Sequence, residues 1–176
     1  GYYVEAASFQ GFEDNSTLGV SVAPAGDVDG DGVDDVLIGA PGVRHVYVLF
    51  GSSSYGSSSL RRRLESNVGA YETAINALDS DSLMILRQDD HDSDSTFGSQ
   101  VSTAGDVNGD GYDDILVGAS KAKGTGRVYV FFGGDRGTLT GHGAWDLTNS
   151  KHLPIERGFR IEGDAGFQGV GASVSG

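Results

Sequence analysis

The sequence predicts an all-β fold made of propeller blades, with two full repeats and the start of a third. The first observation is a duplicated acidic loop, in which residues 27–35 (DVDGDGVDD) recur as residues 106–114 (DVNGDGYDD). The second is that the flanks of the loops match too, and internal repetition on this scale is typical of propellers, solenoids and arrays. The third is a composition with 29 glycines and few helix formers, which suits short strands joined by tight turns.

The apolar segments of each repeat predict four short strands. The runs that precede the loops give the first strand, and the continuous apolar runs after the loops indicate strands buried on both faces. The next runs are β-branched and aromatic and end at glycine, which is typical of a strand followed by a turn. The predicted strands lie in residues 18–26, 36–40, 46–50 and 83–86, and again in 97–105, 115–119, 128–132 and 159–161. Four short antiparallel strands per repeat describe a propeller blade.

We expect a single propeller segment over residues 1–176. Repeat 1 covers about residues 8–82, repeat 2 about 83–158, and a partial repeat 3 covers 159–176, stopping where its own acidic loop would begin. Two insertions interrupt the pattern. Residues 52–81 start as a polar loop and then place apolar residues from Leu60 to Leu78 at helical spacing, so a helix and a loop are both open there. Residues 134–158 carry the only tryptophan, Trp145, and we expect both insertions on one rim of the blades.

The acidic loops have the donor pattern of a calcium site. Calcium takes about 6–8 oxygen ligands, and a glycine at position 6 permits the sharp turn that brings them together. Magnesium fits less well, because it prefers octahedral geometry and retains several waters. The predicted ligands of the two Ca²⁺ sites are Asp27, Asp29, Asp31, the Val33 carbonyl and Asp35 in the first loop, and Asp106, Asn108, Asp110, the Tyr112 carbonyl and Asp114 in the second.

Other calcium-loop families fit poorly. An EF-hand needs a glutamate at position 12 and helical flanks, whereas position 12 here is Ile38 or Val117 and the flanks are strand-like. Cellulosomal dockerins use a similar loop, but a helix follows it and the copies lie closer together. A solvated turn rich in aspartate and glycine remains the alternative to a metal site.

Composition limits the partners. The net charge of −13 makes nucleic acid and anionic membranes poor partners, and two bound divalent ions would bring it to about −9. The sequence has no cysteine, which excludes disulfides and thiolate metal sites. No apolar run approaches the ~20 residues of a membrane-spanning helix. The sequence starts without Met or a signal-peptide pattern, so we expect a mature chain or an excised piece.

The residues around the loops resemble an FG-GAP repeat. The resemblance rests on Phe97-Gly98, the acidic loop, Val117-Gly118-Ala119 and Val128-Tyr129-Val130, with Gly39-Ala40-Pro41 in the first repeat. Such repeats are the blades of the integrin α-subunit β-propeller and of many secreted bacterial proteins, and their acidic loop binds calcium. The sequence departs from the family at Leu18-Gly19 and Val170-Gly171, and it encodes two blades and a fraction where about seven are usual.

Other motifs are weak or absent. The sequence contains no nucleophile elbow, zinc-protease motif, Walker loop or dinucleotide fingerprint. The histidines His45, His91, His142 and His152 are scattered, and we expect surface or loop positions for them. Residues 89–94 form a second acidic cluster, which suits a solvated turn or another cation site. Residues 61–63 are three arginines, a run typical of a solvated helix face. Trp145 suits either a platform on which a sugar stacks or a buried anchor.

The leading interpretation is a non-catalytic, calcium-binding propeller segment of a secreted or surface protein that serves adhesion or protein interaction. Its partner would be another protein or further copies of the same chain, held through open blade edges. The alternatives are an accessory propeller of a secreted hydrolase similar to glycosylphosphatidylinositol-specific phospholipase D, or a lectin that binds a glycan. Fold alone does not distinguish these functions.

Overall fold

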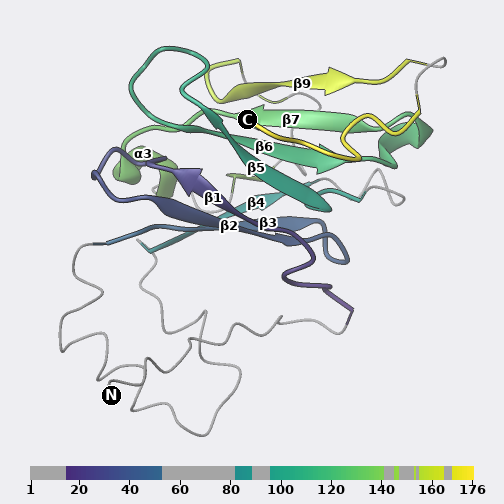
Figure 1. Cartoon of the computed structure of the whole chain (residues 1–176), viewed down its shortest axis with the longest axis horizontal. Coiled ribbons are helices and arrows are strands. Elements are labelled where there is room, and N and C mark those ends of the chain that lie inside the picture. Colours follow the sequence, from purple (N-terminus) through teal and green to yellow (C-terminus); the bar gives the residue numbers. More distant parts are fainter. Residues whose placement is uncertain are drawn as a thin grey trace, which may run out of the picture.

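The chain is described by a computed structural model that covers residues 15–52, 82–88, 96–140, 153, 155–164 and 168–176, together with the backbone of residues 145–146. Within these ranges the strands form two β-sheets that lie one above the other (Figure 1). Strands β1 and β5 lie beside each other, one from each sheet. The predicted helix at Leu60–Leu78, the arginine run 61–63 and the acidic cluster 89–94 lie outside the described residues.

Each sheet contains four consecutive antiparallel strands, so the predicted fold class is confirmed. The first sheet has the order β1 (Val22–Gly26), β2 (Asp35–Ala40), β3 (His45–Leu49) and β4 (Leu83–Arg87). The second has the order β5 (Gln100–Gly105), β6 (Asp114–Ala119), β7 (Arg127–Phe131) and β9 (Gly158–Glu162). The boundary between the sheets does not coincide with the boundary between the predicted repeats. Residues 83–87 begin the predicted repeat 2, but they form β4 and pair with β3 of the first sheet.

The two sheets repeat each other in register as well as in order. Val22 pairs with Ile38 in the first sheet, and Val101 pairs with Val117 at the equivalent position of the second. In both, the register shifts at the end of the first strand, just before the acidic loop. Gly26 and Gly105 end these strands with φ of 77° and 65°, a conformation that favours glycine. The resulting bulge turns the chain from the sheet into the loop.

The insertion at residues 134–158 returns to the first sheet. Its short strand β8 (Trp145–Asp146) pairs in parallel with β4, so this sheet has a fifth strand where the sequence predicted four. Helix α3 (Arg136–Thr140) buries Leu139 in the core at the loop end of the first sheet. A strand of two residues is too short to show an alternation of apolar and polar side chains, so the sequence did not predict β8. A 3-10 turn, η2 (Ala122–Gly124), joins β6 to β7.

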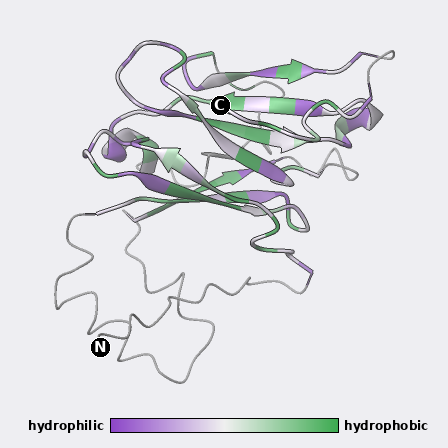
Figure 2. Ribbon diagram, viewed as in Figure 1, coloured by the Kyte–Doolittle hydropathy of each residue, from purple (hydrophilic) through white to green (hydrophobic). Residues whose placement is uncertain are grey.

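Apolar side chains fill the space between the two sheets. The first sheet contributes Leu37, Val46, Val48, Met84 and Leu86, and the second contributes Phe97, Val101, Ile115, Val117, Tyr129 and Phe131. Phe97 packs edge-on against Tyr129, with ring centroids 5.3 Å apart, and against Phe131. Figure 2 shows the consequence along the chain, since the hydrophobic residues lie in the strands and the loops at the sheet ends are hydrophilic. Burial of each large apolar side chain contributes about 1.5–3 kcal/mol to stability.

Glycines mark the place where one blade meets the next. A Cβ on Gly39 would collide with the Gly98 carbonyl oxygen, and a Cβ on Gly118 would collide with that of Gly171. Gly98 and Gly171 both have φ near +80°, at 85° and 82°. The segment 168–176 therefore lies on the second sheet in the way that the segment around Gly98 lies on the first. This close backbone approach explains why both repeats have glycine at the positions of Gly39 and Gly98, and the explanation does not depend on the residue that precedes each glycine.

Candidate metal centre

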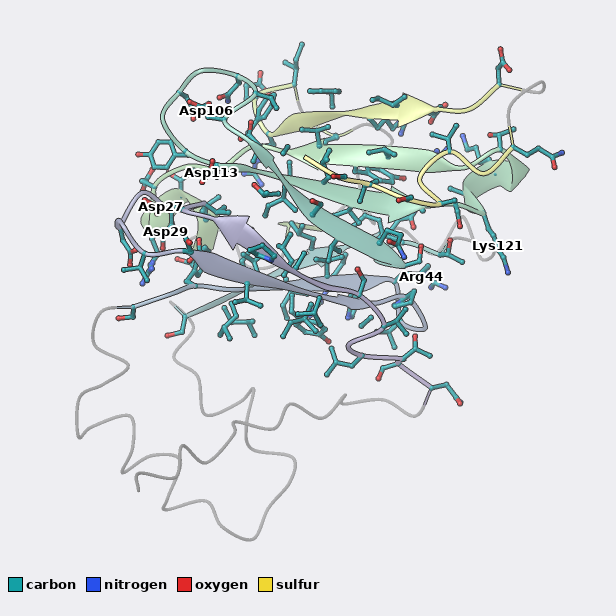
Figure 3. All side chains as sticks on the ribbon, viewed as in Figure 1. Asp27, Asp29, Arg44, Asp106, Asp113 and Lys121 are labelled. Atoms are coloured by element: carbon teal, nitrogen blue, oxygen red, sulfur yellow. The ribbon has the colours of Figure 1, made fainter. Side chains whose placement is uncertain are left out.

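The two acidic loops leave the same end of the paired sheets. Loop 1 (residues 27–35) joins β1 to β2, and loop 2 (residues 106–114) joins β5 to β6. Figure 3 shows Asp27, Asp29, Asp106 and Asp113 at this end, while Arg44 and Lys121 lie at the opposite end of the sheets. The molecule thus concentrates carboxylates where a cation could bind.

Loop 1 is a tight turn closed by hydrogen bonds from its own backbone. Gly30 and Gly32 have φ of 74° and 84°, so both take the conformation that glycine tolerates best. Asp27 Oδ2 accepts the Gly32 N–H at 2.9 Å, Asp29 Oδ1 accepts the Asp31 N–H at 3.1 Å, and Asp31 Oδ1 accepts the Val33 N–H at 2.9 Å. These bonds fix each carboxylate and leave one oxygen of each for another donor or a cation.

The remaining geometry of loop 1 fits a divalent cation. One ligand oxygen from each of Asp27, Asp29 and Asp31 lies within 4.8 Å of the other two. Asp27 Oδ1 is buried and has no hydrogen-bond partner in the described part of the chain. A buried carboxylate oxygen without a partner is costly, and coordination to a cation would satisfy it. Hard carboxylate oxygens such as these are ligands that divalent cations take in proteins.

The aspartate at position 9 of each loop is built into the sheet. Asp35 Oδ2 accepts the Val28 N–H and Oδ1 accepts the Gly51 N–H, at 2.9 and 2.7 Å. Asp114 repeats the pair with Val107 and Gly133, at 2.8 and 2.9 Å. Burial raises the pKa of Asp35 to about 6, with a further contribution from Asp29 and Asp31, although the two N–H bonds oppose it. Burial likewise raises the pKa of Asp114. Both residues therefore hold the loop to the next strand, whether or not they also bind a cation.

Loop 2 has the same turn but a different inner arrangement. Asp106 accepts the N–H groups of Gly109, Asp110 and Gly111, and Asp110 Oδ1 accepts the Tyr112 N–H at 3.0 Å. Asn108 Nδ2 donates to Asp110 Oδ2 at 2.8 Å, a bond that the aspartate of loop 1 cannot make. Among the described residues, loop 1 is the only group of three or more acidic or histidine side chains whose ligand atoms converge.

Two residues of this region were not predicted from the sequence. Arg136, at the start of α3, pairs with Asp29 and Asp31 of loop 1. Asp113, which follows the position 7 residue of loop 2, accepts the Asp27 N–H of loop 1 at 2.8 Å. No local pattern points to Arg136, because the contact spans more than a hundred residues. Asp113 lies inside the acidic motif, and its role depends on the neighbouring sheet.

Of the other predicted candidates, the structure describes the side chain of His45 alone, and this residue lies outside the acidic loops. His45 begins β3 and is half-buried beside Tyr47, with ring centroids 6.0 Å apart. His91, His142, His152 and the side chain of Trp145 lie outside the described residues. None of the helices in the described part of the chain has the length and apolar character needed to cross a membrane.

Comparisons with known proteins point to the same repeats. The FG-GAP repeat family matches residues 18–57 and 97–131, which include both acidic loops. The chain is 35% identical over 136 residues to integrin alpha-PS2 of Drosophila melanogaster, covering 69% of this chain and 8% of that protein. It is 32% identical over 166 residues to mouse integrin alpha-8, covering 90% and 14%, and 33% identical over 143 residues to human integrin alpha-IIb, covering 77% and 12%. The chain thus spans only a small part of the length of these curated relatives.

Proposed function

The chain contains FG-GAP repeats of the integrin α-subunit type, and on this premise we propose that it is a non-catalytic, calcium-binding segment of a β-propeller. The segment serves adhesion or protein interaction on the outside of a cell, as part of a surface or secreted protein. Its partner is a protein rather than nucleic acid, because the acidic surface repels polyanions.

One observation carries the metal assignment. Asp27, Asp29 and Asp31 bring ligand oxygens together around a glycine turn, and Asp27 Oδ1 is buried without a hydrogen-bond partner among the described residues. Calcium would be held by these carboxylates, with the Val33 carbonyl and Asp35 completing the set. The same positions of loop 2, namely Asp106, Asn108, Asp110, the Tyr112 carbonyl and Asp114, form the second site. Bound calcium neutralises the crowded carboxylates, and the residues themselves hold the loop in a turn that already fits it.

Calorimetric titration tests the proposal. With excess magnesium present, we expect about two calcium sites per chain, and Asp31→Ala and Asp110→Ala should each remove one of them. Asp34→Ala is the matched control, because this exposed carboxylate lies in loop 1 outside the predicted ligands and should leave the stoichiometry unchanged. Absence of calcium-dependent heat, or an unchanged stoichiometry in both ligand variants, would show that the loops are solvated turns.

A further inference from the structure

The two loops have nearly the same sequence but do not share the same surroundings. Arg136 reaches loop 1 from α3, a helix that follows β7 of the second sheet in the chain. Its guanidinium pairs with Asp29 and Asp31, donates to the Gly51 carbonyl oxygen at 3.3 Å and lies over the Phe50 ring at 5.0 Å. The side chain is thus held by two carboxylates, a carbonyl and an aromatic face.

Arg136 contacts the carboxylate oxygens that accept no hydrogen bond from the backbone of loop 1. Asp29 Oδ1 and Asp31 Oδ1 accept N–H groups of loop 1, and Asp29 Oδ2 and Asp31 Oδ2 accept from Arg136. A cation in the turn would need these same Oδ2 atoms, together with the unpartnered Asp27 Oδ1. The guanidinium therefore takes part of the coordination that a metal would use.

Loop 2 satisfies the equivalent oxygen with a neutral donor. Asp110 Oδ2 accepts from the Asn108 side-chain amide of the same loop, at 2.8 Å. A cation would replace a neutral amide donor there, so no charge has to leave the site, and Asn108 Oδ1 keeps the Asp110 N–H at 3.1 Å. Displacement of Arg136 from loop 1 instead breaks a multidentate, partly buried ion pair, which is among the stronger polar contacts.

We propose that Arg136 is a built-in competitor for the cation of loop 1, so that loop 2 binds calcium more tightly than loop 1. This inference rests on the proposed calcium binding and deepens it. The number of charged ligands alone predicts the opposite order of affinity, because loop 1 offers four aspartates and loop 2 offers three aspartates and an asparagine. A higher number of charged ligands ordinarily favours the tighter site.

Calorimetry on single-site chains measures the order of affinity. Asp110→Ala leaves loop 1 as the remaining site, and Asp31→Ala leaves loop 2. We expect the calcium dissociation constant of the Asp110→Ala chain to be the larger. Adding Arg136→Gln to Asp110→Ala should tighten loop 1 about tenfold, which corresponds to about 1.4 kcal/mol. Arg136→Met, which keeps an unbranched stem to pack on Phe50, should have the same effect and serves as a second variant if the Gln side chain disturbs α3.

The matched control is Lys121→Gln in the Asp110→Ala background. It makes the same change in net charge at the opposite end of the sheets (Figure 3), so it should leave the affinity of loop 1 unchanged. Equal affinities of the two loops, or no tightening in either Arg136 variant, would overturn the inference while leaving calcium binding intact. Absence of calcium-dependent heat in the unmodified chain would instead refute the proposed function, and the inference with it.

Discussion

At the scale of single residues, position 8 of the two acidic loops shows how a neighbouring blade changes the role of an identical side chain. Asp113 Oδ2 accepts the Asp27 N–H at 2.8 Å, and the Asp113 N–H donates to the Asp27 carbonyl oxygen at 3.1 Å. Asp34 holds the equivalent position in loop 1 and is exposed. The contact joins the loops of successive blades, since both backbone groups of Asp27 bond to Asp113 of the other blade.

Asp113→Ala should destabilise the chain by about 1–2 kcal/mol. The substitution leaves the half-buried Asp27 N–H without its acceptor, and a polar group that loses its partner costs about this much. Urea unfolding measures the change in the free energy of unfolding. Asp34→Ala removes the same charge from the same loop position and should stay within about 0.5 kcal/mol of the unmodified chain. Equal effects of the two substitutions would mean that Asp113 contributes only its charge.

The residues that the sequence could predict are those whose role is local. The turn of loop 1 depends on Gly32 and on carboxylates at alternate positions, so a nine-residue pattern is enough to predict it. Asp113 and Arg136 act on residues of the other blade, and a pattern within one loop carries no information about them. The sequence also did not indicate that Asp35 and Asp114 are buried and bonded to backbone N–H groups on both oxygens.

At the scale of elements, the repeated strands were predictable because each carries its own signal. The runs after the loops are apolar and β-branched, and β2, β3, β6 and β7 lie where they were predicted. Strand β8 is defined only by its pairing with β4, which no local pattern encodes. The same holds for α3, a single turn of helix whose buried Leu139 depends on the core of the first sheet.

The acidic loops are the elements that calcium should stabilise. Calcium binds the folded turns and has little affinity for the unfolded chain, so it should raise the free energy of unfolding by mass action. At a calcium concentration ~100 times the dissociation constant, each site contributes about 2.7 kcal/mol. Thermal unfolding followed by circular dichroism should show a lower melting temperature in chelator, and excess calcium should restore it.

The chain with both Asp31→Ala and Asp110→Ala is the control for this measurement. It should unfold at the same temperature with and without calcium, because neither loop retains its central carboxylate. A melting curve of the unmodified chain that ignores chelator would contradict the proposed sites. A chelator effect that persists in the double variant would place the stabilising calcium elsewhere in the chain.

At the scale of the whole molecule, each sheet packs one face against the other, and described apolar side chains remain exposed on the outer face of both, beside the segment 168–176 on the second. Val22 and Val36 of the first sheet are 61% and 37% exposed, whereas the equivalent Val101 and Ile115 of the second are 6% and 0% exposed. The asymmetry reverses at the loops, where Val28 is 0% and Val107 is 51% exposed. Phe159 and Ile161 of β9 add to the exposed apolar surface of the second sheet. The outer faces thus have the composition of faces that are buried between blades.

These two outer faces are complementary, because each is of the kind that the other sheet buries. We therefore expect the isolated chain to associate head to tail, with the first sheet of one copy on the second sheet of the next. A heterologous contact of this kind either closes a ring or continues. Multi-angle light scattering across a concentration series should show a molar mass that rises above that of the monomer.

Val22→Glu and Val36→Glu place charges on the outer face of the first sheet and should shift association to higher concentration, because a buried unpaired carboxylate is costly. Ile155→Glu adds the same charge at an exposed residue that lies in neither sheet, so it should leave association unchanged. A chain that stays strictly monomeric at high concentration would show that the exposed valines do not form an interface. Equal loss of association in all three variants would attribute the effect to net charge alone, and the complementarity of the two faces would then be wrong as its cause.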